Sequence, residues 1–323
     1  MKRRTTHLFA AAACSLSVAA SADAVEMFWT DPGGVPVGSD VIRTANSDGS
    51  GMQTVVSGLE EPRGMALDLV NGRMYWWSSL GGAGIQGIQG ANMNGSGSVQ
   101  TVITTGNAGG GVAVNSANGY IYYTNAENIP GFTGEIQRVN LDGSNPQTLV
   151  TGLMHPGGIA IDTLDGKVYW TELGGLTSIQ SANLDGSDVQ TILTGIGQAG
   201  GLAVDAVGGK LYWTDSTDHT IASANLNGSG LHNVLTGLDN PTTVALDLSG
   251  GKLYWTSSDG QQASYIASAN LDGSNIQTLV SGVGEPWGIA VTPEPSTFAL
   301  GILGVLSLLA FGRRLRRERL AAL

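Results

Sequence analysis

The chain of 323 residues has little cysteine, little histidine and little charge. It contains one cysteine, Cys14, and four histidines, and only 13% of its residues are charged. With a single cysteine, neither an internal disulfide nor a multi-thiolate metal site can form. Glycine, in contrast, is abundant with 49 copies, which indicates many turns and therefore many short strands.

Positive charge is scarce in the middle of the chain. Between Val25 and Thr292 there are seven Lys or Arg residues against 23 Asp or Glu residues, a net charge of −16. This acidity argues against nucleic acid as a partner. It favours solubility and attracts cations or cationic ligands, although a solvated acidic surface explains it equally well.

Residues 1–24 have the layout of a secretory signal peptide. A basic head is followed by an apolar stretch over 8–20 and a small-residue exit ending Ala22-Asp23-Ala24. The apolar stretch is short for a membrane span, and Cys14 within it is preceded by alanines rather than a lipoprotein box. We expect cleavage after Ala24, with Ala22 as the alternative, and export across the inner membrane.

Residues 293–323 form a tail of three parts. Pro293, Glu294 and Pro295 make an extended box, an apolar run follows over 297–311, and five arginines come last. This order resembles the PEP-CTERM sorting signal of bacteria. The resemblance implies an exosortase, a membrane protease, as processing partner, and a link to exopolysaccharide. It predicts a transient membrane anchor and an extracellular or cell-surface protein; a plain tail anchor, which needs no Pro-Glu-Pro box, is the alternative.

An aromatic segment recurs six times between the two ends. Successive copies are spaced by 47, 47, 47, 43 and 42 residues, a period typical of four-stranded propeller blades. The copies are FWTD 28–31, YWWS 75–78, YYTN 122–125, YWTE 169–172, YWTD 212–215 and YWTS 254–257. A short apolar segment such as GLAVD 201–205 precedes each later copy, and a segment ending in Asp-Gly or Asn-Gly follows.

The repeats predict an all-β protein over residues 25–292, a six-bladed β-propeller of four-stranded antiparallel blades. The first aromatic segment has no inner strand before it, and the last apolar segment, 288–291, has no aromatic strand after it. We expect these two to pair and close the ring, which also hides sheet edges. The recurring Asp-Gly turns are interpreted as hairpins rather than calcium loops, which need a different spacing of carboxylates.

The aromatic segment resembles the YWTD repeat, the class B repeat of the low-density lipoprotein receptor family, over residues 26–292. The resemblance implies that Tyr and Trp belong to the core and that the terminal Asp ties neighbouring blades together. Only Asp31 and Asp215 keep this Asp. Where serine replaces it, as at Ser78 and Ser257, we expect weaker or water-mediated ties because the side chain is shorter. Receptor-type ligand release is not implied, because no cysteine-rich modules are present.

Propellers bind ligands at one mouth of the channel, on loops that enter the inner strands. These loops hold the ligand-binding candidates Glu61, Arg63, His155, Asp239, Asn240, Glu285 and Trp287. Arg63 and Trp287 occupy equivalent positions in adjacent blades, so we expect one amphipathic patch. The alternatives are that Trp287 plugs the channel and that Arg63 pairs with Glu60 or Glu61. The loop 125–134 is a further candidate for recognition.

No catalytic, metal or cofactor site is predicted, since the histidines lie on different segments and no nucleophile elbow is present. The leading hypothesis is a secreted bacterial binding or matrix protein that holds a polysaccharide or an envelope protein. One alternative is a propeller enzyme of lactonase or lyase type with a metal at the mouth, for which Glu61, Asn240 and Glu285 could serve. The other is a purely structural envelope protein.

Overall fold

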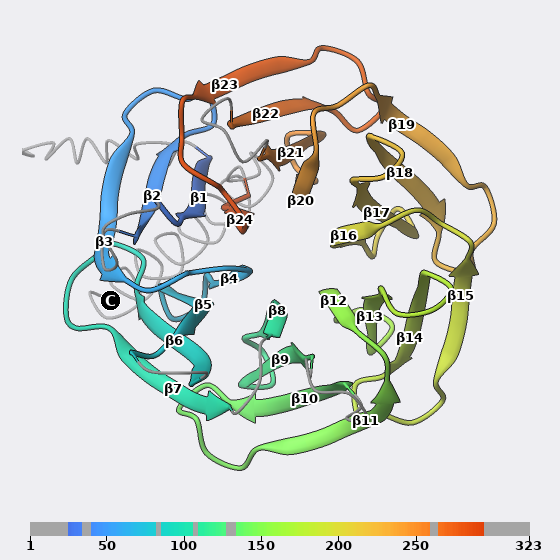
Figure 1. Cartoon of the computed structure of the whole chain (residues 1–323), viewed down its shortest axis with the longest axis horizontal. Coiled ribbons are helices and arrows are strands. Elements are labelled where there is room, and N and C mark those ends of the chain that lie inside the picture. Colours follow the sequence, from blue (N-terminus) through green and yellow to red (C-terminus); the bar gives the residue numbers. More distant parts are fainter. Residues whose placement is uncertain are drawn as a thin grey trace, which may run out of the picture.

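The recurring segments form a closed ring of sheets. The computed structural model describes residues 25–33, 40–81, 85–105, 109–126, 134–258 and 264–293. Its 24 strands form six four-stranded antiparallel sheets arranged in a ring around one axis (Figure 1). The predicted six-bladed propeller is confirmed. No helix able to span a membrane occurs among these residues, and the apolar run 297–311 lies outside them.

Each blade runs from an inner strand at the channel to an outer strand at the rim. The first blade contains β24 (Ile289–Val291), β1 (Glu26–Asp31), β2 (Asp40–Asn46) and β3 (Gln53–Leu59). The second contains β4 (Met65–Asp68), β5 (Arg73–Ser79), β6 (Gln86–Asn92) and β7 (Gln100–Thr105), and the third β8 (Gly109–Asn115), β9 (Tyr120–Asn125), β10 (Gly134–Asn140) and β11 (Gln147–Leu153). The fourth contains β12 (Pro156–Asp162), β13 (Lys167–Glu172), β14 (Ser178–Asn183) and β15 (Gln190–Thr194). The fifth contains β16 (Ala199–Asp205), β17 (Lys210–Asp215), β18 (Thr220–Asn225) and β19 (His232–Thr236), and the sixth β20 (Pro241–Asp247), β21 (Lys252–Ser257), β22 (Tyr265–Asn270) and β23 (Gln277–Ser281).

The ring closes as predicted, by pairing the two ends of the described chain. The last strand, β24, lies antiparallel to β1, with Met27 opposite Val291 and Trp29 opposite Ile289. The sheet order β24-β1-β2-β3 therefore joins three N-terminal strands to one C-terminal strand. The propeller is complete only when this short strand is in place.

The aromatic strands hold the blades together through their two faces. Trp213 packs toward the fourth blade in a cluster with Tyr169 and Ile179, while Tyr254 packs toward the first blade with Met27 and Trp29. Six such clusters join each blade of the described structure to the next. The Trp residues of these strands are almost completely buried, which confirms that they are core.

The threonine of the aromatic motif ties one blade to the next. Where the inner strand bulges between Ala199 and Leu202, the hydroxyl of Thr214 accepts a hydrogen bond from Gly201 N at 3.0 Å. The same hydroxyl donates to Thr242 O, in the next blade, at 2.9 Å. Thr124 and Thr171 make the equivalent pairs of bonds. The hydroxyl thus satisfies a backbone group that the bulge leaves without a ladder partner.

At Asp31, Ser78 and Ser257 the last residue of the motif binds the incoming loop directly. Asp31 accepts from Gly284 N at 2.9 Å, whereas Ser78 donates to Glu60 O at 2.8 Å and Ser257 donates to Asp239 O. The expectation of water-mediated ties was wrong at these two serines, because a loop carbonyl lies within reach of the short hydroxyl; that the ties are weaker stays a prediction. Asp215 bonds to its own loop, at Thr217 N and Asp218 N.

In each blade, the turn that joins the third strand to the outer strand packs against the preceding blade. In the fourth blade Asn183 donates to Ser187 Oγ at 2.8 Å, and Asp185 accepts from Ser187 N and Oγ, which lowers the pKa of that carboxyl. Gly186 in this turn has φ +87° and lies against Leu149 O of the preceding blade. The same glycine contact recurs in the other five blades. These are hairpin turns, as the sequence predicted.

We expect Gly186→Ala to lower the free energy of unfolding by about 2 kcal/mol, since the new Cβ adds a clash with Leu149 O to an unfavourable φ. Gly166→Ala is the matched control, because Gly166 has φ +67° but no atom within 4 Å of an added Cβ. Urea denaturation of both variants measures the difference. Equal destabilisation would show that the inter-blade contact contributes nothing.

Candidate functional site

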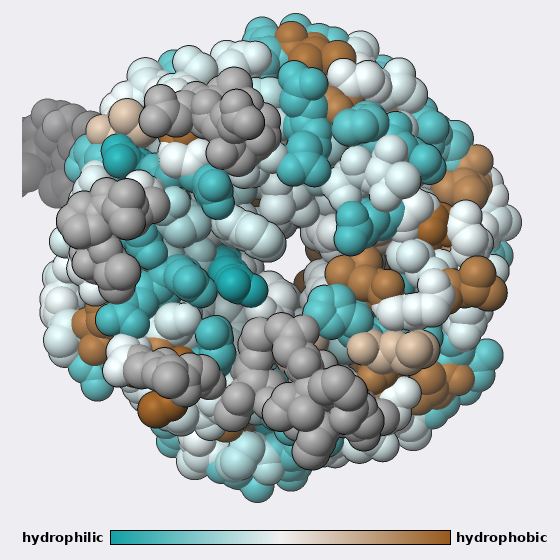
Figure 2. Space-filling view, in the orientation of Figure 1, coloured by the Kyte–Doolittle hydropathy of each residue, from teal (hydrophilic) through white to brown (hydrophobic). Residues whose placement is uncertain are grey.

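One mouth of the channel opens into a pocket of about 380 Å³. Its walls are the loops and first residues of the inner strands of all six blades, with Ala126 and Leu173 from the ends of two aromatic strands. In the space-filling view the channel is open at its centre (Figure 2). Trp287 therefore does not plug it, and the pocket is accessible to a ligand.

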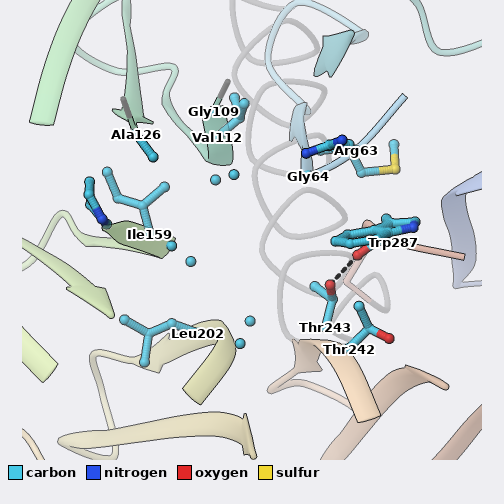
Figure 3. Close-up of a pocket in the computed structure, with 18 of the residues that line it drawn as sticks. Arg63, Gly64, Gly109, Val112, Ala126, Ile159, Leu202, Thr242, Thr243 and Trp287 are labelled. Atoms are coloured by element: carbon cyan, nitrogen blue, oxygen red, sulfur yellow. Dashed lines mark hydrogen bonds between the residues drawn. The ribbon is translucent and has the colours of Figure 1, made fainter. Parts of the chain in front are cut away.

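Arg63 and Trp287 form one wall of the pocket. The guanidinium carbon of Arg63 lies 5.4 Å from the centroid of the Trp287 ring, within the range of cation–π contact. Trp287 is 42% exposed, and its carbonyl accepts a hydrogen bond from the Thr243 hydroxyl, which fixes the backbone that carries the ring (Figure 3). The structure thus brings together the two residues expected to share a patch; their role in binding stays a prediction.

The charge of Arg63 is only partly neutralised at this site. Its Nη2 lies 3.5 Å from Glu61 Oε2, and the Glu61 side chain is 63% exposed. An ion pair this long and this exposed is weak. Glu60 instead accepts from Gly81 N at 2.7 Å. Arg63 therefore keeps hydrogen-bonding capacity for a ligand while it stacks on the tryptophan.

The opposite wall of the pocket is formed by apolar side chains and by glycines. Val112, Ile159 and Leu202 face Arg63 and Trp287 across the opening (Figure 3). At the ring position of Arg63 and Trp287, the blades on this side carry Gly110, Gly157 and Gly200. The mouth is thus asymmetric, with an aromatic and cationic side facing an apolar side where main chain is exposed.

The apolar ring below the mouth was not predicted as part of the site. It is formed by the first apolar residue of each inner strand: Met65, Val112, Ile159, Leu202, Val244 and Ile289. The signal was present, since these residues align across all six repeats. Strand alternation alone does not tell which side of an inner strand faces the channel and which faces the next blade.

Only some of the predicted candidates line the pocket. Arg63, Trp287 and His155 do, and the backbone N of His155 donates to Glu172, which positions its loop. Asn240 and Glu285 are exposed on neighbouring loops, and neither lines this pocket. Asn240 donates to Ser258 O, which stabilises its own turn, and Asp239 is likewise exposed. Loop 125–134 lies largely outside the described residues, which end at Ala126 and resume at Gly134.

The predicted processing residues lie at or beyond the ends of the described chain. Ala24, Glu294 and Pro295 are outside it, and Pro293 is the last described residue, exposed just past β24. Among the described residues no group of three or more His, Cys, Asp or Glu side chains is arranged to hold a metal ion. What the described part of the mouth offers chemically is stacking, one guanidinium and apolar contact.

Comparison with protein families supports the repeat assignment. The model of the low-density lipoprotein receptor repeat class B matches residues 166–206 and 209–248, two consecutive repeats that run from β13 to the end of β20. A comparison with curated protein sequences finds no match.

Solved structures share the fold at low identity. A chain of a nidogen/laminin complex matches with a TM-score of 0.70 and 20% identity, over 83% of this chain and 98% of that chain. TolB from Acinetobacter baumannii matches with a TM-score of 0.70 and 14% identity, over 83% of this chain and 66% of that chain. A gluconolactonase from Xanthomonas campestris matches with a TM-score of 0.54 and 17% identity, over 71% of this chain and 83% of that chain. The repeats, the matching family model and the closed ring together identify the chain as a six-bladed β-propeller that contains class B, or YWTD, repeats of the low-density lipoprotein receptor type.

Proposed function

We propose that the propeller is a binding module that holds a polysaccharide chain at the channel mouth. The observation that carries the proposal is the stacked pair of Arg63 and Trp287 on the rim of an open pocket. An exposed tryptophan offers a flat apolar face to a sugar ring, and the guanidinium donates hydrogen bonds to hydroxyl groups beside it. The apolar far wall then accepts the less polar face of a second ring.

The charge of the propeller narrows the class of polysaccharide. A net charge of −16 over residues 25–292 repels polyanions at long range. A neutral or amino-bearing polysaccharide suits this surface better than one rich in carboxylate or sulfate. Arg63 supplies positive charge at the mouth, but a single guanidinium does not reverse the field of the whole domain.

The two ends of the sequence support a place outside the cell for this module. Residues 1–24 have the layout of an export signal, and residues 293–323 resemble a PEP-CTERM tail. We propose that the protein is exported, that an exosortase-type protease processes the tail, and that the propeller acts at the cell surface or in an exopolysaccharide matrix. A protein ligand in the envelope is the second candidate, favoured by the similar fold in a structure of nidogen with laminin.

Trp287→Ala is expected to weaken polysaccharide binding roughly tenfold or more, because it removes the stacking face at the centre of the site. Arg63→Lys should give an intermediate loss, since lysine keeps the charge but cannot stack as a plane. The measurement is co-sedimentation of residues 25–293 with the extracellular polysaccharide of the producing organism. These residues contain the whole closed ring.

Leu176→Ala is the matched control: Leu176 is 79% exposed and does not line the pocket. Equal binding by wild type and Trp287→Ala would contradict the proposed site. Capture of an envelope protein without polysaccharide binding would indicate the protein ligand, and hydrolysis of a lactone in the same samples would indicate an enzyme. Matrix association unchanged in every variant would indicate a purely structural role.

A further inference from the structure

The face of the propeller opposite the mouth carries a ring of exposed aliphatic side chains. They stand in the turns between inner and aromatic strands, where Gly, Asn and Asp are the usual residues. Leu69, Val70, Leu164, Val207 and Leu248 are 48%, 76%, 69%, 88% and 42% exposed, respectively. These turns belong to four different blades, so the side chains surround the channel exit rather than forming one patch.

Both ends of the described chain emerge at this same face. In five blades a turn joins the inner strand to the aromatic strand, and in the first blade the two chain ends lie at the equivalent position. In the fourth blade the turn glycine Gly166 accepts a hydrogen bond from Leu184 N at 3.0 Å; in the first blade Val25 accepts one from Ser47 N at 2.8 Å. Thr292 N donates to Glu26 O at 2.9 Å, which fixes the two ends side by side. The chain therefore leaves the domain from within the ring of aliphatic side chains.

The sequence beyond this point sets a short tether. Pro293 is exposed, and the apolar run begins at Thr297, so a fully extended chain places the two at most about 14 Å apart. If residues 297–311 enter a bilayer, the face with the exposed aliphatics must lie close to its surface. The exposed aliphatic side chains lie on several sides of the channel axis. A flat membrane surface can contact all of them at once, whereas a single helix or peptide cannot.

We propose that this face docks on the surface of a lipid bilayer, with the turn aliphatics inserted at the headgroup boundary and the channel mouth pointing away. The proposal rests on the transient membrane anchor predicted for residues 297–311, and it applies to the protein before its tail is processed. Arg73, Lys167, Lys210 and Lys252 follow these turns directly and place cationic groups at phosphate height. Lys167 is also paired with Asp188 at 3.0 Å.

The carboxylates of this face select the lipid. Asp48, Asp142, Asp185 and Asp272 are exposed in the outer turns of the same face, and hydrogen bonds from Ser50, Ser144, Ser187 and Ser274 lower their pKa values. They are therefore ionised at neutral pH and repel anionic headgroups. Docking is accordingly stronger on zwitterionic phosphatidylcholine than on vesicles rich in anionic lipid.

The test uses the full chain with Cys14→Ser, reconstituted in phosphatidylcholine vesicles that contain nitroxide-labelled lipid. A fluorophore is attached at Val207→Cys on the docking face or at Leu176→Cys beside the mouth. We expect strong quenching by the nitroxide at Val207→Cys and little at Leu176→Cys. Equal quenching at the two positions, or none at Val207→Cys in vesicle-bound protein, overturns the proposal.

A second variant separates docking from anchoring. A probe at Ala117→Cys, in the exposed turn of the third blade, reports docking while Val70→Asn, Leu164→Asn and Val207→Asn remove apolar contact. We expect these changes to lower the docked fraction roughly tenfold while flotation with the vesicles is kept. Unchanged quenching overturns the proposal, and so does a full chain that fails to float. Polysaccharide binding at the mouth is measured independently and is unaffected by these results.

Discussion

Gly109→Ala is expected to lower the free energy of unfolding by about 3 kcal/mol, because an added Cβ overlaps the indole of Trp77. Trp77 is fully buried, donates from Nε1 to Gly111 O at 3.2 Å, and meets Tyr123 edge-on with ring centroids 5.8 Å apart. Tyr123, against which the indole packs, is itself fully buried. Urea denaturation of the purified propeller gives the value.

An added Cβ overlaps Trp77 because two contacting residues of this seam, Trp77 and Gly109, both differ from their equivalents in the other repeats. The other five blades have threonine where Trp77 stands: Thr30, Thr124, Thr171, Thr214 and Thr256. They have proline or alanine where Gly109 stands: Pro62, Pro156, Ala199, Pro241 and Pro286. The large indole occupies the space that a Cβ takes in the other seams.

A double-mutant cycle tests this pairing. Trp77→Thr alone should cost about 4 kcal/mol through lost burial and a cavity. In that background Gly109→Ala should cost less than about 1 kcal/mol, because it restores the combination found between the fourth and fifth blades. Additive effects of the two substitutions would contradict the proposed coupling.

Thr214→Val is expected to destabilise the propeller by about 3 kcal/mol, because valine keeps the shape but leaves Gly201 N and Thr242 O without their partner. Thr214 is fully buried, so water cannot replace the hydroxyl. The effect on stability is measured by denaturation of the variant and the wild type under the same conditions.

Thr214→Ser is the matched control for this substitution. Serine keeps the hydroxyl and loses one methyl group, which should cost about 1 kcal/mol. If the serine and valine variants were equally unstable, packing rather than hydrogen bonding would hold this seam. A clear difference in the expected direction would assign the inter-blade tie to the hydroxyl.

The architecture was predictable because it is repeated. Six aromatic segments at nearly constant spacing gave the blades, and the unpaired first and last segments gave the closure between β1 and β24. Equivalent repeat positions also predicted that Arg63 lies beside Trp287, as the structure shows. Repetition averages out the local ambiguity that limits such inferences for single strands.

The departures from the repeat were not predictable. The sequence shows YWWS 75–78 as one more copy, yet the contact of Trp77 with Gly109 depends on the bulge in β8 and on the distance between two blades. The serine side chains at the end of the motif were expected to be too short for a direct hydrogen bond to the neighbouring loop. The position of the loop carbonyl that accepts this bond is set by the loop and not by the motif. The far wall of the pocket was missed because strand alternation does not tell which side of an inner strand faces the channel, and because its glycines give no side-chain signal.

The position of Trp287 relative to the end of the described chain has a mechanical consequence. Five residues lie between Trp287 and Pro293, and among them β24 crosses from the mouth to the opposite face. A ligand pulled at the mouth against an anchor in the membrane would therefore transmit its tension along this one strand. Load on Trp287 would run along β24 itself, whereas load taken up by the other blades, through Arg63 for example, would reach the anchor only through the bonds between β1 and β24. Because that force acts parallel to β24, these bonds would be sheared together rather than opened one after another. The seam that closes the ring would then set the force at which the protein fails.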